Sequence, residues 1–244
     1  MKTENSPSRV RARSARHAGR SASAQPGAAV RPPTQTDHAY DQLEELIVTL
    51  QLPPGSAVTE ARLAERLGIG RTPVREALHR LARENLVVAL PQRGYLVSHI
   101  DVRMQLRLLE TRREVERLIA RSAARRATPQ ERARFDVLAD IFEKASLNND
   151  ATAFIRADRE FNELSLLAAR NEFTAGAMQL MHGLSRRFWY MHWRQAADMP
   201  ETAHAHAVLA RAIGKGDEEA AANALDLLLD GIEAFTKATL TTDF

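Results

Sequence analysis

The 244-residue sequence contains no cysteine, which excludes a disulfide framework and a thiolate metal site. No apolar run approaches the roughly eighteen residues that a membrane-spanning helix needs. The N-terminal residues also lack the apolar core of a secretory signal peptide. We therefore expect a cytoplasmic protein without a membrane span.

The sequence carries little net charge, +3 at pH 7, but the charge is unevenly distributed. Residues 1–36 hold seven Lys or Arg against one Glu, a net +6, so residues 37–244 sum to −3. This basic segment is rich in Ser, Ala, Pro and Gly, a composition that predicts a disordered tail. Two interpretations stay open: an arm that binds DNA phosphates without sequence preference, and a solvated leader without a role.

The remaining length is sufficient for two ordinary hydrophobic cores, one of about 65 residues and one of about 140. The pattern of the sequence changes at Asp101, because helical and strand periodicities precede it and only helical ones follow. We therefore expect one domain over residues 37–100 and a second over residues 101–244.

Between Thr59 and Pro73 the sequence predicts a helix, a sharp turn and the start of a second helix. Thr59 is a good N-cap, and apolar residues follow at helical spacing until two glycines bracket Ile69. Pro73 suits a first helical position, because its missing N–H would have no intrahelical partner. The second helix is expected to begin at Pro73, with Thr72 as its cap.

The second helix has an apolar stripe at i, i+3, i+4 and i+7 that is expected to be buried: Val74, Ala77, Leu78 and Leu81. The opposite face is polar and partly cationic: Arg71, Thr72, Arg75, Glu76 and His79. In a helix-turn-helix this helix enters the major groove, where Arg donates two hydrogen bonds to guanine. Arg75 is the expected base-reading residue, and Arg71, beside free helix N–H groups, is expected to bind phosphate.

A two-stranded hairpin, or wing, is predicted after Asn85. Residues 86–90 and the alternating residues 95–99 are typical of strands, and residues 91–94 form the turn between them. Arg93 at the tip is placed to reach the flanking DNA backbone or the minor groove. A helix-turn-helix followed by a wing indicates a DNA-binding domain. Its candidate contacts are Arg62, Arg71, Thr72, Pro73, Arg75, Arg93 and Gly94.

The motifs LGIGRTPVREAL, ENLV and PQRGYLV resemble the DNA-binding domain of GntR-family bacterial transcription regulators, over about residues 40–99. The resemblance implies a winged helix-turn-helix that binds double-stranded operator DNA.

From residue 101 onward we expect six or seven helices in an all-α bundle with antiparallel neighbours, so the protein as a whole is mainly α. The expected ranges are 102–127, 130–147, 150–170, 173–193 with a break left open, 201–213, and a last helix after Asp217. Asp150 and Asp217 are the expected N-caps of the third and the last of these helices. The motifs ETRREVE, ADREFNELSLLAARN and HAVLARAIGKGD resemble the helical effector-binding domain of the FadR branch, called the FCD domain.

The FCD resemblance implies a cavity in which one Asp and three His bind a divalent metal that helps to hold a carboxylate effector. Asp158 and His206 occupy two of these four positions, whereas Asn162 and Leu228 occupy the others. Asn offers only a weak carbonyl ligand and Leu offers none, so we expect no cofactor. Any divalent metal would depend on Asp158 and His206.

What remains is a polar cavity that suits a small ligand with few fixed polar groups, and the family resemblance implies that this ligand is a small organic acid. Asp158 and Asn162 lie at i, i+4 on one helix, and His206 comes from another. Arg112 aligns with a family arginine that meets anionic effectors, and its pairing with Glu116, one turn on, is equally compatible with the sequence.

Arg187 belongs to a segment rich in aromatic residues, 186–193. The default expectation for this segment is burial in the core. Its functional alternative is that Arg187 lines the effector pocket or a dimer interface. The expected effector contacts are Arg112, Asp158, Asn162, His206 and Arg187.

These features predict a ligand-responsive homodimeric transcription regulator that reads an inverted repeat. The family resemblance implies a repressor rather than an activator. The alternative is a DNA-binding architectural protein whose helical domain only dimerises. An enzyme is not expected, because the sequence offers no nucleophile–base constellation or phosphate loop and its one metal constellation is incomplete.

Overall fold

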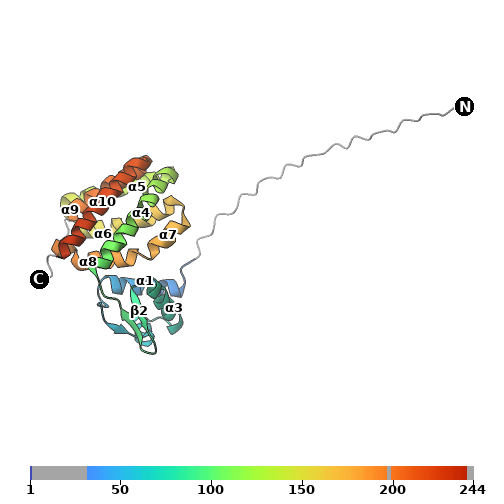
Figure 1. The fold of residues 1–244 in the computed structure, drawn as a ribbon, viewed down its shortest axis with the longest axis vertical. Helices are drawn as coiled ribbons and strands as arrows, with labels where there is room; N and C mark the ends of the chain where they lie inside the picture. The colour runs from blue at the N-terminus through green and yellow to red at the C-terminus, as the bar shows by residue number, and fades with distance from the viewer. Residues whose placement is uncertain (2–31, 197–198, 241–244) are drawn as a thin grey trace. The chain divides into compact units, whose positions relative to one another are not determined.

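The computed structural model describes residue 1, residues 32–196 and residues 199–240, and this part holds ten helices and three short strands (Figure 1). The segment predicted to be a disordered basic tail falls almost wholly on residues 2–31, outside the described residues. None of the described helices combines the length and the apolar character that crossing a membrane requires.

The first folded part is a winged helix-turn-helix. Its elements are α1 (Gln35–Val48), β1 (Ala57–Val58), α2 (Glu60–Leu67), α3 (Arg71–Arg83), β2 (Val87–Leu90) and β3 (Gly94–Val97). The strands pair antiparallel in the order β1-β3-β2, so the predicted two-stranded wing gains a third strand. Strand β1 has two residues, which is too short to leave an alternating pattern in the sequence.

Helix α3 begins two residues earlier than predicted. Its first residue is Arg71, and the carbonyl of the N-cap Gly70 accepts a hydrogen bond from the Val74 N–H at 3.3 Å. The prediction placed Pro73 first because proline has no N–H to leave unpaired. The first helical N–H groups all lack intrahelical acceptors, however, so proline fits the third position equally well. Arg71 therefore lies on the helix itself.

The predicted burial of α3 is confirmed. Its apolar stripe is buried, and its polar face of Arg71, Thr72, Arg75, Glu76 and His79 is exposed. At the C-terminal end of α3, the buried Glu84 accepts hydrogen bonds from the Tyr40 hydroxyl at 2.7 Å and from Arg80 Nε at 3.3 Å. Burial raises the pKa of Glu84, although both of these partners oppose the shift.

Seven helices follow and form the bundle. They are α4 (Val102–Arg126), α5 (Pro129–Asn148), α6 (Ala151–Ala169), α7 (Glu172–Gln179), α8 (His182–Ala196), α9 (Met199–Lys215) and α10 (Glu218–Thr239). The fourth helix, for which the sequence left a break open, is broken into α7 and α8. Asp150 and Asp217 cap α6 and α10 as predicted, and Thr128 forms a capping box with Glu131 at α5.

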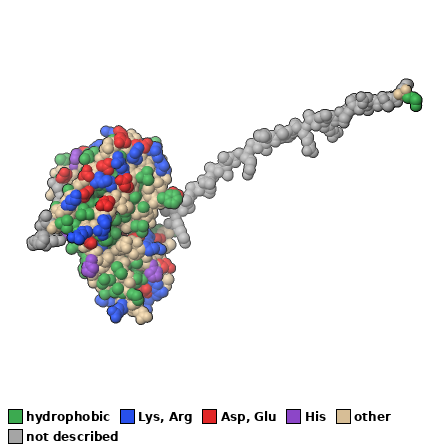
Figure 2. Space-filling view, in the orientation of Figure 1, with side chains coloured by type: hydrophobic (Ala, Val, Ile, Leu, Met, Phe, Trp, Pro, Cys, Tyr) green, Lys and Arg blue, Asp and Glu red, His purple; other side chains and the backbone are tan. Residues whose placement is uncertain are grey.

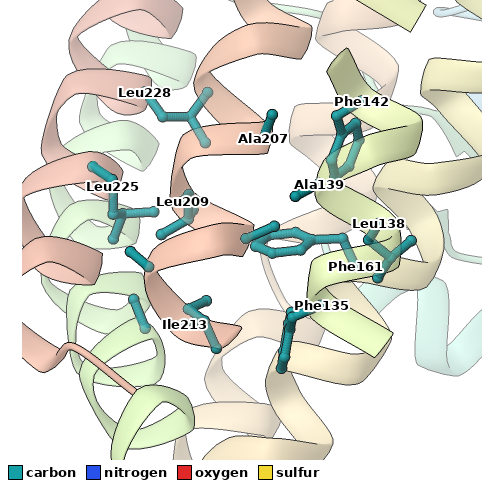
Figure 3. Packing of buried hydrophobic residues seen from close by; sticks show 14 of the residues in the cluster. Phe135, Leu138, Ala139, Phe142, Phe161, Ala207, Leu209, Ile213, Leu225 and Leu228 are labelled. Carbon is teal, nitrogen blue, oxygen red and sulfur yellow. The ribbon is translucent and has the colours of Figure 1, made fainter. Parts of the chain in front are cut away.

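The core of the bundle lies where α5, α6, α9 and α10 face one another. Figure 3 shows Phe142 of α5 and Phe161 of α6 directed toward α9. The two rings meet edge to face with centroids 5.9 Å apart, a favoured aromatic geometry. On the outer face, Arg113 of α4 pairs with Asp226 and Asp230 of α10, and Figure 2 shows interleaved acidic and basic side chains there.

Candidate DNA-binding face and ligand cavity

All seven candidate DNA contacts lie on the helix-turn-helix or on the wing turn. The exposed ones are Arg62, Arg71, Thr72, Arg75 and Arg93, and the partly exposed ones are Pro73 and Gly94. Figure 2 shows basic side chains at the lower edge of the view, where α3 and β2 lie in Figure 1. Among the ion pairs of the described residues, none involves Arg62, Arg71 or Arg93, so their charges are available to phosphates.

Arg75 differs from the other cations because it is paired within the helix-turn-helix. Its Nε donates to both carboxylate oxygens of Glu60 on α2, at 3.1 and 3.0 Å. The Arg75 side chain remains 55% exposed. Only Nε is engaged in this contact, so the two Nη groups of Arg75 retain their donors for DNA.

Gly94 allows the wing to pack closely against the residues that precede α2. Its φ is +94°, and a Cβ at this position would lie 2.4 Å from the carbonyl oxygen of Val58 and 3.4 Å from Thr59 Cα. Glycine is therefore required by both the backbone conformation and the close approach of β1. This contact brings the wing turn beside the N-cap of α2.

A cavity of about 330 Å³ is lined by residues of α1, α4, α6, α8, α9 and α10, a size typical of small-ligand pockets. Four predicted effector residues, Arg112, Asp158, Asn162 and His206, all line it. The walls are rich in apolar and aromatic side chains, including Phe154, Phe161, Phe188, Trp189, Leu228 and Phe235. Leu228 is thus an apolar wall of the cavity, as the sequence suggested.

Arg187, the fifth predicted effector residue, is not among the described residues that line the cavity, and its burial agrees with the default expectation from the sequence. Only 1% of Arg187 is exposed. Its Nη1 donates to the Ser98 carbonyl at 3.0 Å, and its Nη2 donates to Ser98 Oγ at 3.0 Å and to the His99 carbonyl at 3.3 Å. The helical register of α8 points it away from the cavity and toward the segment that follows the wing.

The buried His206 and the partly exposed Asp158 form a pair at the cavity wall. His206 Nε2 lies 3.2 Å from Asp158 Oδ1, and its Nδ1 lies 2.8 Å from the Thr202 carbonyl oxygen. The rings of Phe142, Phe154 and Phe161 surround the imidazole with centroids 5.2, 5.2 and 6.1 Å away. Burial acts to raise the pKa of Asp158, but the hydrogen bond and charge of His206 outweigh it and lower that pKa.

Arg112 is paired with Glu116, the arrangement that the sequence left open. Arg112 Nε donates to Glu116 Oε1 across one helical turn, and Arg112 Nη1 donates to Ser185 Oγ at 2.9 Å. Both charged side chains are at most 15% exposed, so water screens the pair less than it screens a surface ion pair. An anionic ligand must compete with Glu116 for Arg112.

His182 and Ser185 of α8 are among the further polar residues of the cavity that sequence reasoning did not assign to it. Burial lowers the pKa of His182, with the nearby Glu116 carboxylate opposing the shift, so its ring is neutral at pH 7. The spacing of these residues in the sequence carries no signal for a site. Only the packing of α8 places them in the cavity.

The side chains at this cavity do not fit the four-ligand metal site that the resemblance implies. Asp158 and His206 contact each other, Asn162 is a weak ligand, and Leu228 has no donor atom. Within the described residues, no group of three or more His, Cys, Asp or Glu side chains is placed to hold a metal ion.

Comparison with protein families identifies both halves of the chain. Residues 35–97 match the family model of bacterial regulatory proteins, gntR family, and residues 107–231 match that of the FCD domain. The chain belongs to the GntR family. It is accordingly a GntR-family transcription regulator with an FCD effector domain, and its relatives are regulators rather than enzymes.

Individual relatives agree with this assignment. The galactonate operon transcriptional repressor of Escherichia coli is 28% identical over 211 residues, which span 78% of this chain and 91% of that protein. An HTH-type transcriptional regulator of Streptomyces ambofaciens is 47% identical over 62 residues, but the chain spans only 26% of its length. The solved structure of E. coli McbR/YncC shares the fold, with a TM-score of 0.71 and 22% identity over 85% of this chain and 99% of that one.

Proposed function

We propose that this GntR-family regulator is a homodimeric repressor that binds an inverted-repeat operator. A small organic acid raises or lowers its affinity for that operator. Residues 37–100 read the DNA, and residues 101–244 bind the effector and dimerise. The name of the galactonate operon repressor supports repression as the sign of regulation. A two-fold axis relating two winged domains would match the symmetry of an inverted repeat.

The observation that carries the ligand-responsive part of this proposal is a run of three consecutive residues in α8. Ser185 lines the cavity and accepts a hydrogen bond from Arg112. Arg186 pairs with Glu44 of α1 at 3.1 Å, and Arg187 binds Ser98 beyond the wing. A ligand that displaces Arg112 from Ser185 would therefore alter the contacts of α8. Because α8 also contacts the winged helix-turn-helix domain, this change is a physical basis for coupling between the effector site and the DNA-binding site.

The proposed effector is held without a metal. Its carboxylate would bind Arg112 and Ser185, and its apolar body would lie against the aromatic walls. The polar groups of Asn162 and His182 would accept or donate the remaining hydrogen bonds.

A thermal-shift screen of the full-length, EDTA-treated protein tests this proposal. The probes are divalent metals and a panel of small carboxylates and sugar acids, each alone and in combination. A ligand at a hundred times its dissociation constant stabilises the protein by about 2.7 kcal/mol, which is readily measured. An acid that shifts the melting temperature without metal, and that changes the affinity for a selected operator, supports the proposal. A requirement for metal contradicts the metal-free site.

An architectural DNA-binding protein, with a helical domain that only dimerises, is the second candidate. The incomplete metal constellation favours it. It predicts that no acid in the panel changes operator affinity.

Arg75→Ala is expected to weaken operator binding by about 1–3 kcal/mol and to relax the preference at one base pair, because a bidentate contact to guanine is lost. Arg71→Ala is expected to weaken binding to all sequences and to lower the slope of log affinity against log salt by about one. Fluorescence anisotropy with the selected operator and its single-base variants, at several salt concentrations, measures both effects. Uniform weakening by Arg75→Ala would instead make Arg75 a phosphate contact.

Glu116→Gln is expected to tighten the binding of an acid found in the screen by about fivefold to tenfold, because it removes the carboxylate that competes for Arg112. Calorimetric titration of the two proteins with the same acid measures the difference. Glu233→Gln serves as the control, since Glu233 forms an i, i+4 pair with Lys237 and neither residue lines the cavity. Weaker binding to the Glu116→Gln protein would show that Glu116 itself contacts the ligand.

A further inference from the structure

The contact between Glu60 and Arg75 connects the two helices of the helix-turn-helix at their exposed side. Glu60 is the first residue of α2, directly after the N-cap Thr59. A carboxylate at this position is favoured by the free N–H groups and the dipole of the helix N-terminus. Glu60 is therefore a well-anchored acceptor, whereas Arg75 extends from the fifth residue of α3.

The atoms used in the contact leave one edge of the guanidinium available. Nε of Arg75 donates to both Glu60 oxygens, so the carboxylate occupies the Nε side of the group. Recognition of guanine O6 and N7 needs two parallel donors, and the Nη1–Nη2 edge provides them. A long side chain that is already held in one orientation also loses less conformational freedom when it binds.

The Glu60–Arg75 pair is not explained by a contribution to the folding stability of the protein. The Arg75 side chain is 55% exposed and that of Glu60 is 27% exposed, and ion pairs in such positions contribute little to folding. The pair lies near the wing as well, since the charges of Glu60 and Arg75 both act on the pKa of Tyr95 in β3, which burial raises. A carboxylate among DNA-facing cations also repels phosphate, so its presence there calls for a specific role.

We propose that Glu60 is a positioning residue for base recognition: it holds Arg75 through Nε so that the Nη1–Nη2 edge is presented to a guanine. The inference rests on the proposed function, in which Arg75 reads a base pair. Glu60 makes no base contact itself and acts only through Arg75.

The test uses the full-length protein and an operator selected from a random double-stranded DNA library. Affinities are measured for that operator and for all single-base variants, with the wild-type, Arg75→Ala, Glu60→Ala, Glu60→Gln and Glu60→Ala/Arg75→Ala proteins. Glu65→Ala is the matched control, because Glu65 is an exposed acid of the same helix that takes part in none of the ion pairs of the described residues.

Glu60→Ala is expected to lower discrimination about threefold to tenfold at the base pair where Arg75→Ala lowers it. The melting temperature is expected to fall by only a few degrees, because α2 loses a favourable carboxylate at its N-terminus. Glu60→Gln is expected to lie between wild type and Glu60→Ala, since its amide oxygen still accepts one hydrogen bond. Adding Glu60→Ala to Arg75→Ala is expected to cause no further loss of discrimination. Glu65→Ala is expected to change the affinity for all sequences by the same factor.

Two results would overturn the inference while leaving the proposed function intact: wild-type discrimination in the Glu60→Ala protein, or a further loss when Glu60→Ala is added to Arg75→Ala. If the wild-type protein selects no common sequence, the proposed operator recognition fails, and the role of Glu60 fails with it.

Discussion

Arg187→Ala is expected to destabilise the protein by about 3–5 kcal/mol, the largest effect of any single substitution considered for this chain. The guanidinium is 1% exposed and donates to the Ser98 carbonyl, Ser98 Oγ and the His99 carbonyl. Its removal would take the donor from three partly buried acceptor oxygens and would open a void beside α8. Burial lowers the pKa of Arg187 to about 10, so the group remains charged at neutral pH.

The cost of burying this charge opposes its hydrogen bonds. Within the described residues no carboxylate pairs with Arg187, and its Nε has no hydrogen-bond partner. Removing an uncompensated buried charge is favourable by itself, so the sign of the effect depends on which contribution is larger. We expect the hydrogen bonds to be larger, because three oxygens accept from one planar donor group that no other side chain replaces.

Urea unfolding at pH 7 of Arg187→Ala, Arg187→Met and Arg187→Lys separates these contributions. Arg187→Met retains most of the volume without donors, so an expected loss of about 2–3 kcal/mol measures the hydrogen bonds. Arg187→Lys retains the charge but not the planar donor geometry and is expected to be destabilised as well. Arg159→Ala removes an exposed arginine with an i, i+4 partner and is expected to change stability by less than about 0.5 kcal/mol. A methionine variant as stable as wild type would contradict this account.

Gly94→Ala is expected to destabilise the winged domain by about 2–4 kcal/mol and to weaken DNA binding. The new Cβ would lie 2.4 Å from the Val58 carbonyl oxygen, a contact that requires β1 and β3 to separate. The backbone at Gly94, with φ +94°, is also unfavourable for alanine. Because the wing turn would shift with β3, Arg93 would leave the position from which it is expected to reach DNA.

Gly68→Ala is the matched control for the steric part of this effect. Gly68 has a φ of +64°, but no atom lies within 4 Å of a Cβ built there. Its expected cost is therefore only that of the left-handed backbone, about 1–2 kcal/mol. Thermal melts compare the two variants, and hydrogen exchange of the β1–β3 amides locates the damage. Equal destabilisation of the two proteins would show that the approach of β1 is not the cause.

Much of the fold was predictable because its signals are local. The caps at Asp150 and Asp217 and the capping box at Thr128 satisfy N–H groups within three residues. The buried stripe of α3 follows from helical periodicity alone. The same local logic accounts for the Arg112–Glu116 pair, which one helical turn brings together.

The cavity was predictable only in part. The resemblance to the FCD domain brought Arg112, Asp158, Asn162 and His206 together, and the structure places all four at one cavity. His182 and Ser185 were not assigned to the cavity, because their positions depend on how α8 packs against the rest of the bundle. For Arg187 the sequence left core burial and the effector pocket open, and only the packing of α8 decided for burial.

The sequence by itself determined the helices, the turn and the cation-bearing face of α3, since each depends on residues a few positions apart. Tertiary structure alone decided the pairing of β1 with β3, the hydrogen bonds from Arg187 to Ser98 and the contact of Glu60 with Arg75. These contacts join residues 15 to 89 positions apart. No local pattern specifies them, because they form only after independent elements pack and bury their apolar faces together.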